Sequence, residues 1–166
     1  DNTWQILMGE CEKANPFDLV PVKVPGINIG YGGGILLGLS KSSGEYVSWS
    51  HADLQCPAED VGKLYKKVVN SPNPKQAFGK GNRINRVGRE AVLTRIQSIL
   101  SWIILGYFME EINAQPKLFH RSFLNSFKQP PNGYELDFYT FYKAKVSGLD
   151  IVTVDVLFLD RKSGDS

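Results

Sequence analysis

Segments that favour a helix and segments that favour a strand alternate along this chain, and this order constrains the fold more than any other feature. The expected helices cover residues 2–14, 35–40, 57–69, 90–112 and 134–146, and the expected strands cover residues 19–24, 46–50, 76–79 and 151–158. Such alternation is typical of an α/β domain with a largely parallel sheet flanked by helices. Ligands of such sheets bind beyond the carboxyl ends of the strands, so we expect a site in the loops after residues 50, 79 and 158.

The composition indicates one folded domain over residues 1–166 and excludes several classes of protein. Hydrophobic residues make up 42% and charged residues 22%, which argues against disorder. The net charge is +2, too balanced to imply nucleic acid or an anionic membrane as a partner by itself. The most apolar run, residues 99–109, is shorter than a membrane span.

The cysteines and the two ends of the chain suggest where the protein works and what kind of segment this is. Cys11 and Cys56 lie far apart and form no C-x-x-C pair, which favours a reducing, cytoplasmic location. Asp1 stands in the place of a starting Met and a helix follows almost at once, so we expect an internal segment of a longer protein.

A polar cluster directly follows the apolar strand expected over residues 46–50. Asp53 and Gln55 lie between that strand and the next helix. A carboxylate there can bind a divalent cation, and the amide of Gln55 can add a neutral oxygen ligand. Mg²⁺ and Mn²⁺ prefer such oxygen ligands and often bridge to substrate phosphates. On spacing alone, a turn capped by Asp53 is the simpler interpretation.

Residues 44–57, GEYVSWSHADLQCP, resemble the family 2 glycosyltransferase motif, in which a G-E-Y strand leads into D-A-D-L-Q-x-P. The resemblance implies a GT-A fold in which this motif binds Mg²⁺ or Mn²⁺ and the ion holds the donor diphosphate. Asp53 matches the second Asp, so we expect it to serve in metal binding, donor binding and catalysis, and Gln55 matches the Gln. His51 replaces the first Asp. It could be a metal ligand, a donor to phosphate, a sign of weakened metal use or a structural residue.

Further segments resemble parts of the family that contact the donor. Asp1 opens a stretch similar to the end of the nucleoside-binding D-D-G-S-T-D-x-T motif, and Arg161 and Ser166 match the R-x-x-G-x-S ending near the diphosphate. The glycine-rich residues 28–34 resemble a segment beside the donor, although a tight turn with close helix packing would also explain them. The family's first strand, first helix and second strand have no counterpart, so we expect a sheet that is incomplete at the N-terminus.

Residues 80–89 form an expected basic loop that is a candidate for binding the acceptor. Lys80, Arg83 and Arg86 could clamp a phosphate, because cationic side chains pair with phosphate oxygens. The resemblance implies the same role, since basic residues of this region hold the acceptor phosphate in the polyprenyl-phosphate branch of the family. A solvated basic loop is the alternative.

Two more segments add candidates near the active site. Residues 112–121, INAQPKLFHR, resemble a signature of a bacterial and archaeal subgroup of the family, which implies that Gln115 and Lys117 lie near the active site. Asp137 matches the acidic residue of an F-x-x-D segment. It could contact the sugar or the acceptor as a catalytic general base, or it could stabilise a helix start.

The resemblance as a whole implies transfer of a sugar from a UDP or GDP donor to a polyprenyl-phosphate or glycan acceptor, with metal assistance and inversion. Two alternatives remain open: a catalytically impaired nucleotide-sugar-binding domain, and a non-enzymatic α/β interaction domain. The helix expected over residues 90–112 is apolar on nearly all sides in its second half. It packs in the core or against a further segment, or it contacts the cytoplasmic face of a membrane beside a lipid-linked acceptor.

Overall fold

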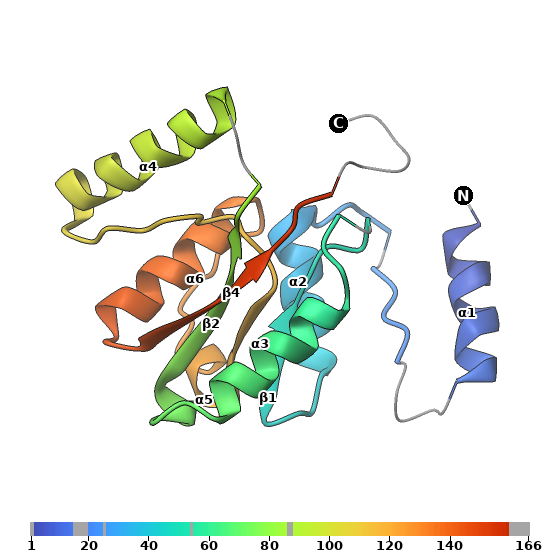
Figure 1. Ribbon diagram of the computed structural model, residues 1–166. Helices are drawn as coiled ribbons and strands as arrows, with labels where there is room; N and C mark the ends of the chain where they lie inside the picture. The colour runs from blue at the N-terminus through green and yellow to red at the C-terminus, as the bar shows by residue number, and fades with distance from the viewer. Residues whose placement is uncertain (1, 15–19, 25, 54, 86–87, 160–166) are drawn as a thin grey trace.

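The computed structural model describes residues 2–14, 20–24, 26–53, 55–85 and 88–159 (Figure 1). The helices are α1 (Thr3–Lys13), α2 (Gly30–Lys41), α3 (Glu59–Val69), α4 (Arg89–Leu105), α5 (Arg121–Leu124) and α6 (Glu135–Val146), with a 3₁₀ turn, η1, at Pro74–Gln76. The strands are β1 (Tyr46–Trp49), β2 (Ala77–Arg83), β3 (Lys117–His120) and β4 (Asp150–Val156).

The four strands form one sheet in the order β1-β3-β2-β4. β2 pairs with β4 in parallel, and β3 pairs antiparallel with both β1 and β2. Three strands therefore run in the same direction, as the sequence predicts for an α/β domain, and β3 is an unexpected antiparallel insertion. Phe119 of β3 lies opposite Val47 on one side and Phe78 on the other, which fixes the register of the centre.

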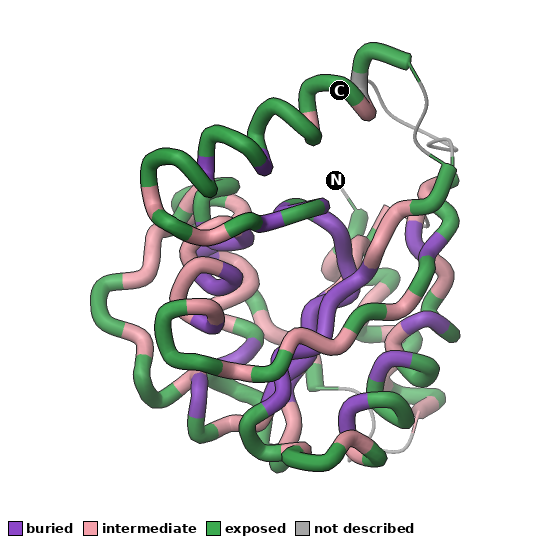
Figure 2. The backbone as a smooth tube through the Cα atoms, turned by 60° about the vertical axis from the view of Figure 1, so that its left-hand side comes forward, coloured by how far each residue is buried: buried purple, intermediate pink, exposed green. Residues whose placement is uncertain are grey.

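Helices cover both faces of the sheet and divide the core in two. On one face α3 packs its apolar side against β2, β3 and β4, and Leu64, Val68 and Leu118 are buried there. The other face carries a larger cluster rich in aromatic rings, beside α6. Phe78 lies at its centre, stacked 5.7 Å from Phe119 and 5.9 Å from Phe141. Figure 2 shows buried residues running through the centre of the molecule, where β2 and β3 are mostly buried, whereas β4 is mostly intermediate or exposed.

Two expected elements differ from the structure near the N-terminus. The described part of the strand expected over residues 19–24 is not in a strand. Pro21 has no N–H for a ladder, and Val20 and Val24 are exposed, so nothing favours pairing there. The helix expected from residue 35 begins earlier, at Gly30, and therefore includes the glycine-rich residues. α1 has no buried residue and lies apart from the sheet (Figure 1).

The centre of the sheet contains the two largest corrections. The strand expected over 76–79 extends to Arg83, so Lys80 and Arg83 belong to a strand rather than to a loop. The sequence did not predict the full strand because glycine, here Gly79 and Gly81, has a low intrinsic preference for strands. Here a Cβ on Gly79 would lie 2.8 Å from Val68 Cγ2, so glycine is what lets α3 pack closely. β3 was not predicted.

α4 ends earlier than predicted and faces outward. Gly106 adopts a left-handed conformation, φ 76°, and stops the helix after Leu105. Packing of this helix in the core, one of the expected alternatives, is wrong, since its buried described residues are Ser98 and Ser101 while most of its apolar side chains are exposed and only Leu105 packs against the core. The exposed apolar face comprises Val92, Leu93, Ile96, Ile99, Leu100, Ile103 and Ile104. Figure 2 shows most of this helix as exposed. No described helix is long and apolar enough to cross a membrane.

Candidate functional site

The loop after β1 holds the predicted cluster of Asp53, Gln55 and His51. Oδ1 of Asp53 accepts a hydrogen bond from the backbone N–H of Gln55 at 3.1 Å and lies 4.0 Å from Nδ1 of His51. The Gln55 amide donates to the carbonyl oxygen of Leu159 at 3.2 Å, and the N–H of Leu159 donates back to the Gln55 carbonyl at 2.9 Å. The cluster is therefore fixed to the segment that follows β4.

His51 is neutral at physiological pH in this environment. Burial lowers the pKa of its imidazole below its ordinary value, and the nearby carboxylate of Asp53 only partly opposes that shift. Arg83 and Lys117 lower the same pKa further. A neutral imidazole can offer a lone pair to a metal, whereas an imidazolium cannot.

Phe158 joins this cluster to the carboxyl end of β2. The His51 ring meets the Phe158 ring edge to face at 5.5 Å, and the Arg83 guanidinium lies 5.4 Å from the same ring. Asn85 holds the Phe158 backbone with two hydrogen bonds, of 2.8 and 3.1 Å. The ends of β1, β2 and β4 thus converge, as the sequence predicts for a parallel arrangement.

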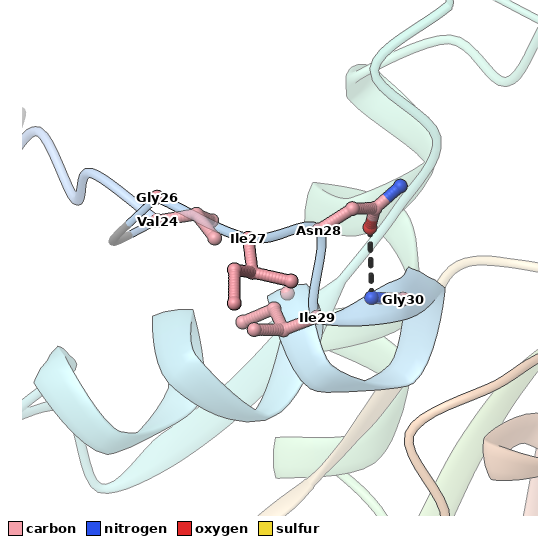
Figure 3. A pocket seen from close by; sticks show the side chains of 7 residues that line it. Val24, Gly26, Ile27, Asn28, Ile29 and Gly30 are labelled. Atoms are coloured by element: carbon pink, nitrogen blue, oxygen red, sulfur yellow. Dashed lines mark hydrogen bonds between the residues drawn. The ribbon is translucent and has the colours of Figure 1, made fainter.

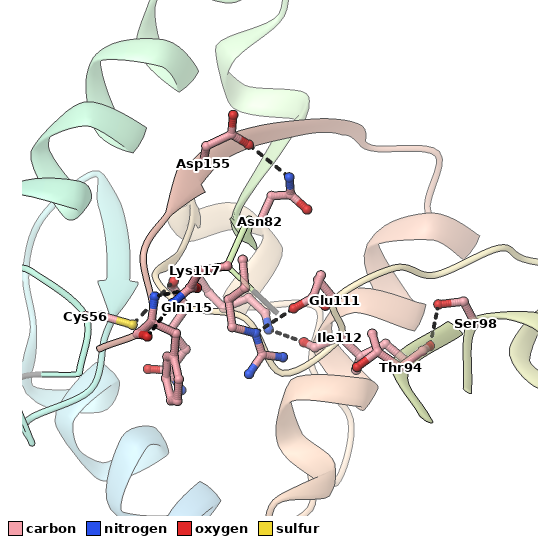
Figure 4. A network of polar contacts seen from close by, with 12 residues as sticks. Cys56, Asn82, Thr94, Ser98, Glu111, Ile112, Gln115, Lys117 and Asp155 are labelled. Atoms are coloured by element: carbon pink, nitrogen blue, oxygen red, sulfur yellow. Dashed lines mark hydrogen bonds and ion pairs between the residues drawn. The ribbon is translucent and has the colours of Figure 1, made fainter. Parts of the chain in front are cut away.

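Arg83 forms a buried ion pair that the sequence did not reveal. Its Nε donates to Oε2 of Glu111 at 2.5 Å, and both side chains are largely buried. Glu111 itself adopts a left-handed backbone conformation, φ 49°, which is unusual for a residue with a side chain. Figure 4 shows Glu111 and its neighbours Gln115 and Lys117 in one polar network.

Asp137 and Lys117 form the buried centre of that network. Nζ of Lys117 lies 3.0 Å from Oδ1 of Asp137 and also donates to the carbonyl oxygen of Ile112 at 2.5 Å. Oδ2 of Asp137 accepts a hydrogen bond from the Tyr31 hydroxyl at 2.9 Å. Burial lowers the pKa of Lys117, and the opposite charge of Asp137 counters this only in part. Both carboxylate oxygens are engaged, so Asp137 acts first of all as the partner of Lys117 and Tyr31.

Tyr31 connects this ion pair to Gln115. The Gln115 amide donates to the Tyr31 hydroxyl, and burial followed by the charge of Asp137 holds the pKa of Tyr31 well above its usual range. Two buried polar atoms, Oγ of Ser50 and Oε1 of Gln115, lack a hydrogen-bond partner among the described residues, whereas the Trp49 side chain acts on the Tyr31 hydroxyl as a donor. Buried polar atoms are rarely left unpaired, so Ser50 and Gln115 make the carboxyl end of β1 a place where a bound polar group would gain contacts.

Lys80 does not join these residues. Its side chain is on the same face of the sheet as Lys117 but lines a separate pocket beside β4. Burial, followed by the charge of Lys117, lowers the pKa of Lys80 to about 7. Asp1, Arg86, Arg161 and Ser166, all predicted to bind donor or acceptor, lie outside the described residues.

The glycine-rich segment lines a pocket of its own. Val24, Gly26 and residues 27–30 surround a space of about 340 Å³ together with Gly34 (Figure 3). Oδ1 of Asn28 accepts a hydrogen bond from the N–H of Gly30 at 2.9 Å and so orders the start of α2. A Cβ on Gly32 would lie 2.7 Å from the carbonyl oxygens of Pro131 and Gly133. Close helix packing therefore explains Gly32, as the alternative interpretation anticipated.

Reasoning from the sequence missed Tyr31, Glu111 and Trp49. Tyr31 stands inside the glycine-rich segment, where only the glycines drew notice. Glu111 directly precedes the INAQPKLFHR stretch and could have been found there as an acid beside a basic segment. Trp49 lies in a strand that the sequence marks only as apolar, and its interaction with Tyr31 becomes visible only in three dimensions.

Comparisons with known proteins concern the family and the fold of the chain. The family model described as Glycosyl transferase family 2 matches residues 1–128. No curated protein matches the sequence significantly. Among solved structures, glucosyl-3-phosphoglycerate synthase from Mycobacterium tuberculosis in complex with phosphoglyceric acid is similar, with a TM-score of 0.63 and 18% sequence identity. The same enzyme in complex with uridine diphosphate gives a TM-score of 0.62 and 20% identity.

Each alignment covers 99% of this chain and 58% of the solved chain. The chain thus spans less than two thirds of the length of the enzyme it resembles. At these identities the likeness concerns the fold, and it confirms the predicted GT-A architecture.

Proposed function

Because the chain belongs to glycosyl transferase family 2, we propose that it serves in the transfer of a sugar from a nucleotide-diphosphate donor to an acceptor. The observation that carries the proposal is the convergence of Asp53, His51 and Arg83 around Phe158, where β1, β2 and β4 end. A carboxylate, a neutral imidazole and a guanidinium at one sheet edge suit a diphosphate and its counter-ion. The similar solved enzyme in complex with UDP supports UDP over GDP as the donor.

We propose that Asp53, with His51 and Gln55, would hold Mg²⁺ or Mn²⁺ together with the donor. These side chains offer the types of ligand atom that such an ion accepts: a carboxylate oxygen, a neutral imidazole nitrogen and the amide oxygen of Gln55. The amide nitrogen of Gln55 is hydrogen-bonded to the carbonyl oxygen of Leu159. No group of three or more His, Cys, Asp or Glu side chains within the described ranges could hold a metal alone. Donor phosphates and water would therefore complete the coordination. A bound divalent ion would neutralise charge on the departing nucleoside diphosphate.

Arg83 is our candidate for binding a phosphate group directly. Its Nε is held by Glu111, and the structure gives its two Nη nitrogens no ion pair among the described residues. The Glu111 contact fixes the plane of the guanidinium, which reduces the side-chain entropy lost when a phosphate binds. Arg83 would thus stabilise the developing negative charge of the leaving group or hold the phosphate of an acceptor.

The surroundings of Asp137 favour an acceptor that is already ionised. Asp137 is 3% exposed, and both of its oxygens accept hydrogen bonds from Lys117 and Tyr31. A role as general base for a hydroxyl acceptor would require Tyr31 to release Oδ2 first. A phosphate nucleophile needs no base, so a polyprenyl phosphate or another phosphate acceptor fits better than a glycan hydroxyl. Lys117 and Gln115 would then act by positioning Asp137 and Tyr31.

The outward apolar face of α4 supports a membrane as the place of the reaction. The face combines seven exposed aliphatic side chains with Arg89 and Arg95, which are also exposed, and with Trp102 near its C-terminal end. This combination is typical of helices that lie in an anionic membrane interface. The polar side of α4 carries Thr94 and Ser98, which line a pocket of about 260 Å³ shared with Arg83 and Glu111. A lipid phosphate would reach Arg83 along this side.

Vesicle binding tests the role of α4. The protein should sediment with vesicles that contain anionic lipid and less with neutral ones, and Ile103→Glu should abolish sedimentation. Val146→Glu, a matched change at an exposed valine of α6, should have no effect. Equal sedimentation of wild type and Ile103→Glu would contradict membrane contact, as would formation of a dimer through this face.

Release of nucleoside diphosphate from UDP- and GDP-sugars in the presence of Mn²⁺ or Mg²⁺ tests the transferase proposal. We expect turnover that Asp53→Asn removes while the fold is unchanged. A second candidate function is binding of the nucleotide sugar without catalysis. It is favoured by His51, which stands where the family motif has its first Asp. Binding without turnover for every donor would select that candidate and refute the enzyme.

A further inference from the structure

The geometry points to a second anion-binding site on the α6 side of the sheet, in which Lys80 binds a carboxylate or phosphate group of a small organic ligand and Lys145 adds a second positive charge to the same pocket. The inference does not depend on sugar transfer, since none of its residues belongs to the Asp53 cluster. The pocket has a volume of about 270 Å³. It is lined by Lys80, Asn82, Phe108, Glu110, Phe141, Lys145, Ile151 and Thr153.

The first argument is the isolation of the Lys80 ammonium. Lys80 is 2% exposed, yet among the residues that the structure describes it forms no ion pair and donates no hydrogen bond. Its contact is with a ring, because Nζ lies 5.2 Å from the centroid of Phe141. The amine is open only to the pocket that it lines, so its hydrogen bonds are made to whatever occupies that pocket. An unpartnered donor that lines a pocket is a place for an acceptor from outside.

Lys145 places a second cation at the same ring. Its Nζ lies 5.7 Å from the centroid of Phe141, and it too has no ion pair within the described part of the chain. Both lysines line the same pocket, so each can act as a charged donor to an anion bound there. Phe108, Phe141 and Ile151 supply apolar walls. The pocket is at the small end of the range for ligand sites, so the ligand is a small organic anion rather than a nucleotide.

The charges around Lys80 set its protonation. Lys117 of β3 and Arg83 of β2 disfavour its charge, whereas Glu110 and Glu111 favour it, and Lys145 of α6 lies near the same Phe141 ring. Burial is the largest effect, and Lys80 has a pKa of about 7 in the absence of a ligand. A bound anion would favour the ammonium form, so binding above neutral pH should take up a proton. Glu110 stands at the exposed rim and should weaken binding of a dianion.

The test uses the intact chain with lysine labelled at Cε, observed by NMR, and inorganic phosphate and acetate as probes. In chloride the Lys80 signal should titrate near pH 7, and saturating phosphate should move this midpoint upward. Lys80→Met should remove this signal and weaken phosphate binding about tenfold or more, as expected for the loss of a charged hydrogen bond. Lys66 is an exposed lysine of α3 on the other face of the sheet, so Lys66→Met should change neither the Lys80 signal nor the affinity for phosphate.

Each result decides the matter. A Lys80 midpoint that neither anion moves would overturn the site, and so would phosphate binding that persists in Lys80→Met. Stronger effects of acetate than of phosphate would identify a carboxylate as the ligand group. If Lys80→Met does not fold, Lys145→Met replaces it, because this partly exposed lysine can be removed without opening the core. It should weaken phosphate binding severalfold, and unchanged affinity would refute the site.

Discussion

The pair of Lys117 and Asp137 gives the sharpest prediction about stability. Lys117 is 0% exposed and forms two contacts, with Oδ1 of Asp137 at 3.0 Å and with the Ile112 carbonyl at 2.5 Å. Lys117→Met fills a similar volume but leaves a buried carboxylate bonded only to Tyr31. Removing one partner of a buried ion pair costs about 3–5 kcal/mol. For a domain of this size that corresponds to a loss in Tm of roughly 6–20 °C.

Urea denaturation followed by circular dichroism measures this loss, with an unchanged m-value as the sign that the fold is retained. The double variant Lys117→Met with Asp137→Leu removes both charges and should be more stable than Lys117→Met alone. Lys66→Met, at an exposed position, should change stability by less than about 0.5 kcal/mol. A cost below about 1 kcal/mol for Lys117→Met, or additive effects in the double variant, would refute the reasoning.

Three other predictions follow from single contacts. Gly81→Ala places a Cβ 2.8 Å from the Gln115 carbonyl carbon and still closer to its oxygen, so it should lower the free energy of unfolding in urea by about 2 kcal/mol or more. Gly62→Ala, at a position of α3 with open space around it, should raise that free energy by about 0.5–1 kcal/mol. Similar values for both variants would contradict the close packing at Gly81. Lys80 has a pKa near 10.5 in the unfolded chain and about 7 in the folded one, so the unfolded state binds more protons between these pH values. The free energy of unfolding of the wild type should therefore rise relative to that of Lys80→Met, by up to about 1 kcal/mol per pH unit from about pH 7 to 9. A difference that does not change with pH would contradict the lowered pKa. Because the pKa of His51 is lowered in the folded state, the protein should lose stability as the pH falls below the ordinary value of 6.5. His51→Gln should reduce this loss of stability at acid pH. An unchanged loss in the variant would show that His51 does not titrate this way.

The fold was predictable where the pattern was local. Val47 and Trp49 mark β1, and Gly148 marks the end of α6, so those elements lie within about two residues of the expectation. β2 was cut short because Gly79 and Gly81 are poor strand formers by themselves. Their place in the sheet follows from α3 and from the Gln115–Pro116 segment, which need space close to the backbone.

The site was predictable only in its parts. Asp53, Gln55 and His51 are neighbours in sequence, so a motif could group them, and Arg83 joins them through Phe158. The pairing of Lys117 with Asp137 depends on how β3 meets α6, and no local pattern carries that information. The apolar pattern of α4 was correctly recognised, but the sequence did not show that the apolar face points outward. Hydrophobicity alone cannot distinguish a face that packs in the core from one that is exposed.

Binding of UDP in the presence of Mn²⁺ tests the central claim most directly. Isothermal titration calorimetry should give Mn²⁺-dependent binding to the wild type and at least about a tenfold loss for Asp53→Asn, as expected when a charged ligand of the metal is removed. Asp150→Asn, at an exposed acid at the start of β4, should bind as the wild type does. Equal affinity of Asp53→Asn and the wild type would contradict a donor site centred on Asp53.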